Sequence, residues 1–166
     1  ADHETGGISL GTGAYALNLK VLEHQKASEE ELTAKIKALR KEKNNKVSWE
    51  DIRTLLTGNL GFWDAVRLSD KQERELREVY EESFKGQEVK LEKSLYSSNE
   101  PMAGKAIRML NKMALVGWTS GGHSAGVVPV YAIGAGAQLF QGKLDNTDIP
   151  RKIAEAAGYE RKSREI

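Results

Sequence analysis

The chain has no cysteine, almost no net charge and no long apolar run. Without cysteine it forms neither disulfides nor thiolate metal sites, so any metal chemistry must use carboxylate and imidazole groups. The formal net charge of +1 predicts no strong attraction to nucleic acid or to a membrane surface. No apolar run approaches the roughly 20 residues that span a bilayer. The hydrophobic content of 39% allows one buried core, so we expect a soluble domain with no nucleic-acid or membrane partner.

Helix signals are concentrated in the middle of the chain. Ser28, Ser48 and Ser69 each occupy a predicted N-cap position, followed three residues later by a side-chain acceptor. A fourth helix is predicted to begin near Pro101, because proline suits the first helical turn. Apolar residues recur at helical spacing after these starts. They are Leu32, Ile36, Leu39, Ile52, Leu55, Leu56, Leu76, Val79, Tyr80, Ala106, Ile107, Leu110, Met113 and Ala114. The patterns predict a subdomain of four helices.

Short apolar segments outside these helices predict strands. The segments are residues 7–11, residues 114–118 and residues 127–133. The last one is rich in β-branched residues and contains Pro129, which favours a sheet edge or the start of a strand. A final helix is predicted to begin at Asn146 or Thr147 and to stop at Gly158.

Two glycine-flanked loops contain residue types that hold zinc. In the first, Asp2 and His3 lead into a glycine pair, and in the second, His123 follows one. Carboxylate oxygen and imidazole nitrogen suit a catalytic zinc ion, and glycine lets the backbone approach it. Thr119 and Ser120 are predicted to orient the ligands by hydrogen bonds. Three ligands do not complete a site that also needs a nucleophile and a base, so the pattern predicts part of an active site.

Both loops resemble segments of the alkaline phosphatases, in which an Asp-His pair and a distant His help to hold two catalytic zinc ions. The similar segments are residues 1–11, residues 117–126 and residues 128–137, with Phe140, Gly142 and residues 145–149 after them. The resemblance implies an α/β fold, here the C-terminal part of an alkaline-phosphatase-like α/β sandwich. Residues 1–13 and 117–166 would form this portion. Residues 14–116 would be a large helical insertion of the kind found in some bacterial alkaline phosphatases.

The resemblance also implies a role for each ligand. Asp2 and His3 match the ligands of the zinc ion that binds the nucleophile, and His123 matches a ligand of the zinc ion that positions the phosphate oxygen. The nucleophile, the other zinc ligands and the magnesium ligands would precede Ala1, so no catalytic residue is expected in this chain. We expect it to be the C-terminal portion of a longer enzyme, inactive when isolated.

The complete protein is expected to hydrolyse phosphomonoesters with two zinc ions and magnesium, in the periplasm or outside the cell. Exposed strand edges and apolar surface also predict a homodimer of the isolated chain. Two alternatives stay open. A phosphodiesterase or phosphomutase of the same superfamily would share the Asp-His pair and the distant His, although residues 146–148 favour the monoesterase. In a non-catalytic helical interaction module, residues 28–116 would be the functional part.

Other patterns have simple structural interpretations. Residues 134–136 contain two glycines but lack the lysine of a phosphate-binding loop, so they predict a tight turn. The basic run within residues 35–46 is diluted by glutamates and predicts a solvated helix face. Phe62 and Trp63 are interpreted as core packing, and His24 as a surface or packing residue.

Overall fold

The computed structural model describes residues 3–13, 15–85, 91–93 and 98–159. The chain divides into two compact units: Ala1–Thr5 with His123–Ile166, and Gly6–Gly122. In this division, residues 6–13 and 117–122 belong to the same unit as most of the helices. The identification of residues 14–116 as an insertion stays a prediction.

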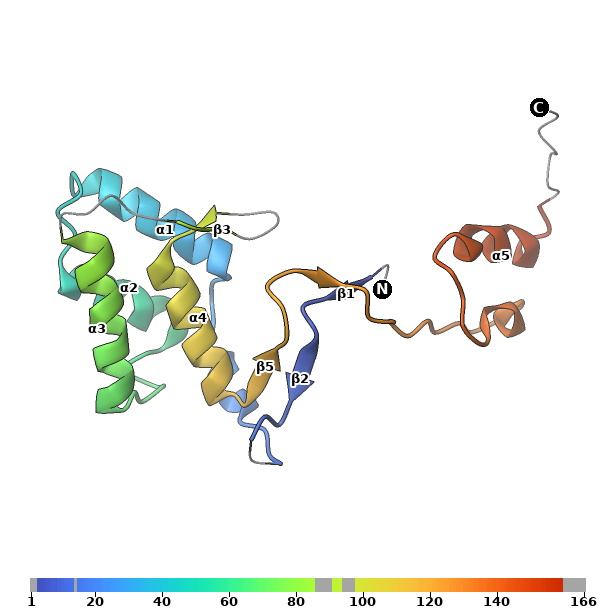
Figure 1. Cartoon of the computed structure of the whole chain (residues 1–166), viewed down its shortest axis with the longest axis horizontal. Coiled ribbons are helices and arrows are strands. Elements are labelled where there is room, and N and C mark those ends of the chain that lie inside the picture. The colour runs from blue at the N-terminus through green and yellow to red at the C-terminus, as the bar shows by residue number, and fades with distance from the viewer. Residues whose placement is uncertain (1–2, 14, 86–90, 94–97, 160–166) are drawn as a thin grey trace. The chain divides into compact units, whose positions relative to one another are not determined.

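The larger unit contains most of the helices, with α1 to α4 labelled in Figure 1. Its elements are β2 (Ile8–Leu10), the 3-10 helix η1 (Leu19–His24), α1 (Glu29–Glu42), α2 (Trp49–Leu60), α3 (Asp70–Phe84), β3 (Glu92–Lys93), β4 (Ser98–Asn99), α4 (Pro101–Met113) and β5 (Val116–Trp118). The smaller unit contains β1 (Glu4–Thr5), β6 (His123–Ser124), the 3-10 helix η2 (Ala137–Phe140) and α5 (Asp148–Ala156). Within the described ranges, no helix combines the length and the apolar character needed to cross a bilayer.

The four predicted helices of the larger unit are confirmed, and so are their start signals. The side chains of Ser28, Ser48 and Ser69 each accept a hydrogen bond from the backbone N–H three residues later, and the serine N–H donates to the side-chain oxygen at that position. These reciprocal bonds satisfy two of the N–H groups that a helix start leaves unpaired. Pro101 occupies the first turn of α4. Local sequence therefore determines where these helices begin.

The core of the larger unit is formed by the predicted apolar helix faces. Fully buried side chains of these faces are Leu32, Ile36, Ile52, Leu56, Leu76 and Leu110. Phe62 is also fully buried, and Trp63 packs edge-on against Trp49 at 5.8 Å between ring centroids. The indole N–H of Trp63 donates to a carboxylate oxygen of Glu73 at 3.0 Å. The interpretation of Phe62 and Trp63 as core packing is confirmed.

Two glycines of the α2 region predict opposite results for the same substitution. Gly61 ends α2 at φ +70°, where an added Cβ would lie 2.8 Å from the Cβ of His24. Gly58 lies inside the helix, and its Cβ would meet nothing within 4 Å. We expect Gly61→Ala to lower the free energy of unfolding by about 1–2 kcal/mol, the cost of a left-handed backbone. Gly58→Ala should raise it by about 0.5–1 kcal/mol through helix propensity. Chemical denaturation measures both, and a stabilised Gly61→Ala chain would contradict the steric argument.

Two of the three predicted strands are confirmed. β2 and β5 lie within residues 7–11 and 114–118 and pair antiparallel. The strand predicted at residues 127–133 is wrong, since these described residues form no strand and Ile133 is fully exposed. β-Branched composition favours a strand only where a neighbouring backbone accepts and donates the ladder hydrogen bonds. The described part of the chain provides no such neighbour, and Pro129 has no N–H to donate.

The C-terminal helix is confirmed as α5. Gly158, at φ +70°, follows its last turn in the left-handed conformation typical of a helix end. Before the helix, Asp145 accepts hydrogen bonds from the hydroxyl of Thr147 at 2.7 Å and from its backbone N–H at 2.9 Å. These two bonds hold the pKa of Asp145 below its usual value, and the bond from the hydroxyl has the larger effect. The tight turn predicted at residues 134–136 is confirmed by left-handed Gly136.

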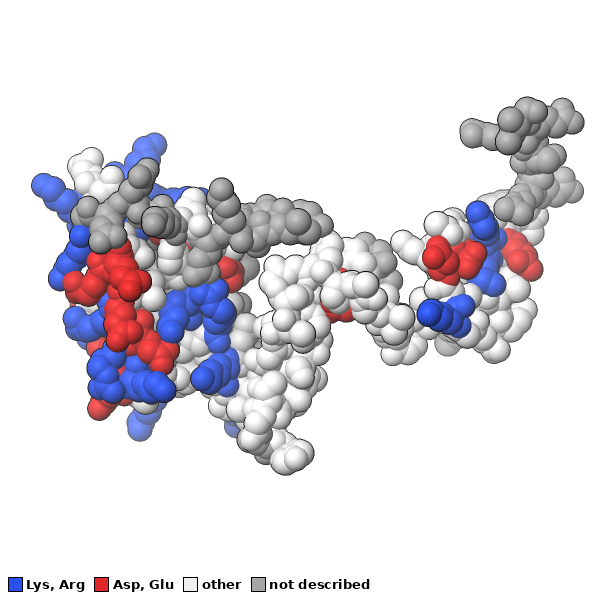
Figure 2. Space-filling view, in the orientation of Figure 1, with Lys and Arg blue, Asp and Glu red and all other residues white. Residues whose placement is uncertain are grey.

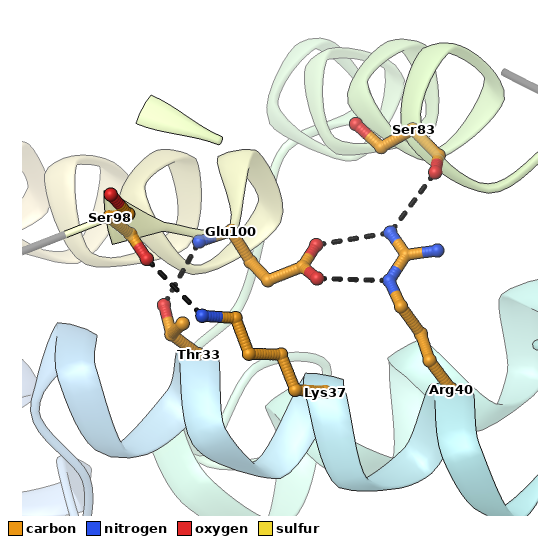
Figure 3. Close-up of polar contacts among 6 residues, drawn as sticks. All are labelled: Thr33, Lys37, Arg40, Ser83, Ser98 and Glu100. Atoms are coloured by element: carbon orange, nitrogen blue, oxygen red, sulfur yellow. Dashed lines mark hydrogen bonds and ion pairs between the residues drawn. The ribbon is translucent and has the colours of Figure 1, made fainter. Parts of the chain in front are cut away.

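The basic run of residues 35–46, on α1 and just after it, is exposed except at Arg40, where the prediction was wrong. The exposed members are Lys35, Lys37, Lys41, Lys43 and Lys46. The side chain of Arg40 is only 11% exposed and pairs with the carboxylate of Glu100 at the start of α4. Figure 3 shows the guanidinium directed toward Glu100 and the backbone carbonyl of Ser83. Helical spacing could not reveal this, because Glu100 lies 60 positions away.

Candidate metal centre

Strand pairing brings the two predicted ligand loops together. β1 and β6 pair antiparallel, with Glu4 opposite Ser124 and Thr5 opposite His123. The imidazole rings of His3 and His123 lie 3.8 Å apart between centroids, with their planes tilted by 36°. Both side chains are exposed. The structure therefore combines two of the three predicted ligands at one exposed site.

The contacts of His3 show how one of its ring nitrogens is bound within the protein. Its Nδ1 lies 3.0 Å from the backbone carbonyl oxygen of Glu4. A carbonyl oxygen only accepts, so Nδ1 is the donor in this hydrogen bond. The hydroxyl oxygen of Thr5 lies 3.3 Å from the same nitrogen and can share its N–H. Metal-binding histidines typically donate their other N–H in this way.

A second set of hydrogen bonds crosses the β1–β6 pair. The Ser124 hydroxyl donates to the carboxylate of Glu4 and accepts from the backbone N–H of Gly126 at 3.2 Å. A Cβ at Gly126 would lie 3.1 Å from Cγ of Glu4 and 3.3 Å from Oγ of Ser124. The absence of a side chain at Gly126 therefore leaves room for the carboxylate and the hydroxyl to meet.

Thr119 and Ser120, the residues predicted to orient ligands, hydrogen-bond to the backbone of the glycine loops. The Thr119 hydroxyl donates to the carbonyl oxygen of Gly7 at 2.9 Å, and its N–H donates to that of Gly6 at 2.8 Å. The Ser120 hydroxyl donates to the carbonyl oxygen of Gly122 at 2.7 Å. These bonds stabilise the turns that flank the ligands, and the orienting role itself stays a prediction.

The described residues form a partial donor set. Asp2 lies outside the described residues, and no group of three or more His, Cys, Asp or Glu that could hold a metal occurs among those that are described. The donor chemistry of His3 and His123 fits zinc, which binds imidazole nitrogen but takes three or four protein ligands. Among the described residues the set is therefore incomplete, and Asp2 stays a predicted third donor. His24 packs beside Gly61 in the larger unit, which confirms its interpretation as a packing residue.

Glu4 and Ser124 were missed by the sequence analysis. The only sequence feature that could have identified them is their position, because each directly follows a predicted histidine ligand. Figure 2 shows charges of both signs interspersed over the helices of the larger unit and few over strands β2 and β5 on the face drawn. Glu4 is a half-buried carboxylate in a strand that directly follows one of the two imidazoles.

Known proteins resemble this chain in sequence and in structure. The family model for alkaline phosphatase matches residues 1–159. Alkaline phosphatase 3 of Bacillus subtilis (strain 168) is 30% identical over 161 residues, which are 96% of this chain and 29% of that protein. Alkaline phosphatase 4 of the same organism is 47% identical over 47 residues, 28% of this chain and 10% of that protein.

A solved structure extends the likeness to the fold. The crystal structure of a cold-active alkaline phosphatase from the psychrophile Shewanella sp. matches with a TM-score of 0.63 at 22% identity, covering 97% of this chain and 33% of that one. The predicted α/β fold is thereby confirmed. The chain spans about a third of the length of the relatives that it matches over most of its own length.

Proposed function

The chain belongs to the alkaline phosphatase family, and we propose that it forms part of a zinc-dependent phosphomonoester hydrolase. Its contribution would be three zinc ligands: Asp2, His3 and His123. The observation that carries this proposal is the imidazole pair, which lies 3.8 Å apart between ring centroids beside two paired strands that are distant in the sequence. Two-metal hydrolases hold their ions close together, so ligands of both ions must lie near one another, as these two imidazoles do.

The residues of this chain would bind and orient rather than react. His3 would bind zinc through its imidazole, whose Nδ1 is already oriented by the carbonyl oxygen of Glu4. Together with Asp2 it would serve the ion nearest the nucleophile, and His123 would serve the second ion. Zinc, when bound, supplies Lewis-acid catalysis at the phosphate ester. The nucleophile, the remaining zinc ligands and the magnesium ligands are proposed to lie elsewhere in the complete protein.

Relatives named alkaline phosphatase support the monoesterase over the phosphodiesterase or phosphomutase alternatives. A phosphomonoester is therefore the proposed substrate of the complete protein. The periplasm or the cell exterior is the proposed location, and a homodimer the proposed assembly.

Zinc binding by the chain itself tests the ligand proposal. We expect calorimetry with Zn²⁺ to detect weak binding, because a partial donor set holds the ion loosely. His3→Ala and His123→Ala should each abolish it, whereas His24→Ala is the matched control and should leave it unchanged. No turnover of p-nitrophenyl phosphate is expected from the isolated chain. Zinc binding that survives the loss of either imidazole would contradict the proposed ligands, and turnover would contradict the proposed division of the active site.

A further inference from the structure

Glu4 contacts both halves of the imidazole pair. Its backbone carbonyl accepts from Nδ1 of His3 at 3.0 Å, which sets the tautomer and the ring orientation of that histidine. Its carboxylate accepts from the hydroxyl of Ser124, the residue that directly follows His123. Through these two groups, one residue links the first ligand loop to the second.

The strands that carry the imidazoles are too short to hold their register by backbone pairing alone. β1 and β6 contain two residues each, well below the usual five or six. A register slip of one residue turns every side chain to the opposite face, which would move His123 away from His3. The Glu4–Ser124 bond joins residues that lie directly opposite each other, so it opposes this slip.

The surroundings of the bond favour its formation. Ser124 Oγ accepts from the N–H of Gly126 at 3.2 Å, which leaves its own hydrogen directed at the Glu4 carboxylate. Glu4 is half-buried, and the missing side chain of Gly126 provides its space. A hydrogen bond to a charged group is worth roughly twice a neutral one.

We propose that Glu4 is a positioning residue that acts through Ser124 to hold the imidazoles of His3 and His123 together, and is not itself a zinc ligand. This inference rests on the proposed zinc function, because the imidazoles are positioned in order to bind zinc. The contact between the two rings can nevertheless be measured without metal. Two conservative variants separate the roles. Glu4→Gln keeps an oxygen acceptor for the hydroxyl, and Ser124→Thr keeps the donor.

NMR of the metal-free chain provides the first test. We expect cross-relaxation between the ring protons of His3 and His123 in the unmodified chain, in Glu4→Gln and in Ser124→Thr. The signal should be lost in Glu4→Ala and in Ser124→Ala, while the amide spectrum of the larger unit stays unchanged. Persistence of the ring contact in Glu4→Ala would overturn the proposal. If Glu4→Ala alone fails to fold, the Ser124→Ala chain tests the same bond.

Titration of the same samples with Zn²⁺ is the second test. Loss of a residue that orients a metal ligand typically weakens binding 10–100-fold, and we expect at least about 10-fold for Glu4→Ala and for Ser124→Ala. The double variant should bind no more weakly than the weaker single variant, because both changes break one bond. If the Glu4→Gln chain loses zinc binding as completely as the His3→Ala chain, Glu4 is a direct ligand and the proposal is overturned. An intact ring contact without zinc binding in the unmodified chain would contradict the expected zinc binding by this chain and leave the positioning role supported.

Discussion

Replacing Arg40 with leucine is expected to lower the free energy of unfolding by about 3–5 kcal/mol, because it leaves a buried carboxylate unpaired. The side chain of Glu100 is 2% exposed, and the two oxygens of its carboxylate each lie 3.0 Å from a nitrogen of the Arg40 guanidinium. Leucine has no donor, so the carboxylate would lose both of these hydrogen bonds. Urea denaturation of the variant and of the unmodified chain measures the loss.

The guanidinium of Arg40 also joins three helices, which adds to the expected effect. It donates to the backbone carbonyl of Ser83 near the end of α3 at 3.0 Å, and its central carbon lies 3.8 Å from the ring centroid of Phe84. The N–H of Glu100 donates to the hydroxyl of Thr33 on α1 at 3.1 Å, as Figure 3 shows. Arg40→Lys should therefore also destabilise the chain, since an ammonium group cannot form the same paired contact.

An exposed ion pair provides the control. The Nζ atom of Lys43 lies 3.2 Å from Oδ1 of Asp51, and the two side chains are 42% and 24% exposed. Lys43→Leu should lower the free energy of unfolding by no more than about 1 kcal/mol. The double variant Arg40→Leu, Glu100→Leu should recover much of the lost stability, because an apolar pair can replace a buried ionic one. Equal losses for Arg40→Leu and Lys43→Leu would show that burial of the Glu100 charge does not matter.

Replacing His123 with alanine in the complete protein should reduce phosphomonoester hydrolysis by more than about 100-fold. Changes to residues that only orient a metal ligand already cost 10–100-fold, and the loss of a ligand should cost more. The zinc content of the purified protein should fall in parallel. His3→Ala should have a similar effect, because its ring lies against that of His123.

His24→Ala in the same protein is the matched control for this experiment. His24 packs beside Gly61 and takes no part in the imidazole pair, so activity and zinc content should stay near normal. Full activity of the His123→Ala protein would remove this residue from the proposed zinc site. Lost activity with unchanged zinc content would give His123 a role other than that of a ligand.

The described helices of the chain were largely predictable because their signals are local. Ser28, Ser48 and Ser69 bond to residues three positions away, and helical periodicity shows which face is buried. The strand predicted at residues 127–133 failed for the opposite reason. A strand needs a neighbouring backbone, and composition alone does not show whether one is present.

The sequence by itself determined the helix boundaries, the apolar faces that form the core, and the histidines that offer metal-binding nitrogen. Only the tertiary structure decided which of these residues meet. Glu4 and Ser124 are 120 positions apart and Arg40 and Glu100 are 60 apart, and no local pattern relates either pair. The physical reason is the sequence separation of the interacting residues. Helix capping and helical periodicity act between residues a few positions apart, whereas strand pairing and buried ion pairs form only when distant segments pack together.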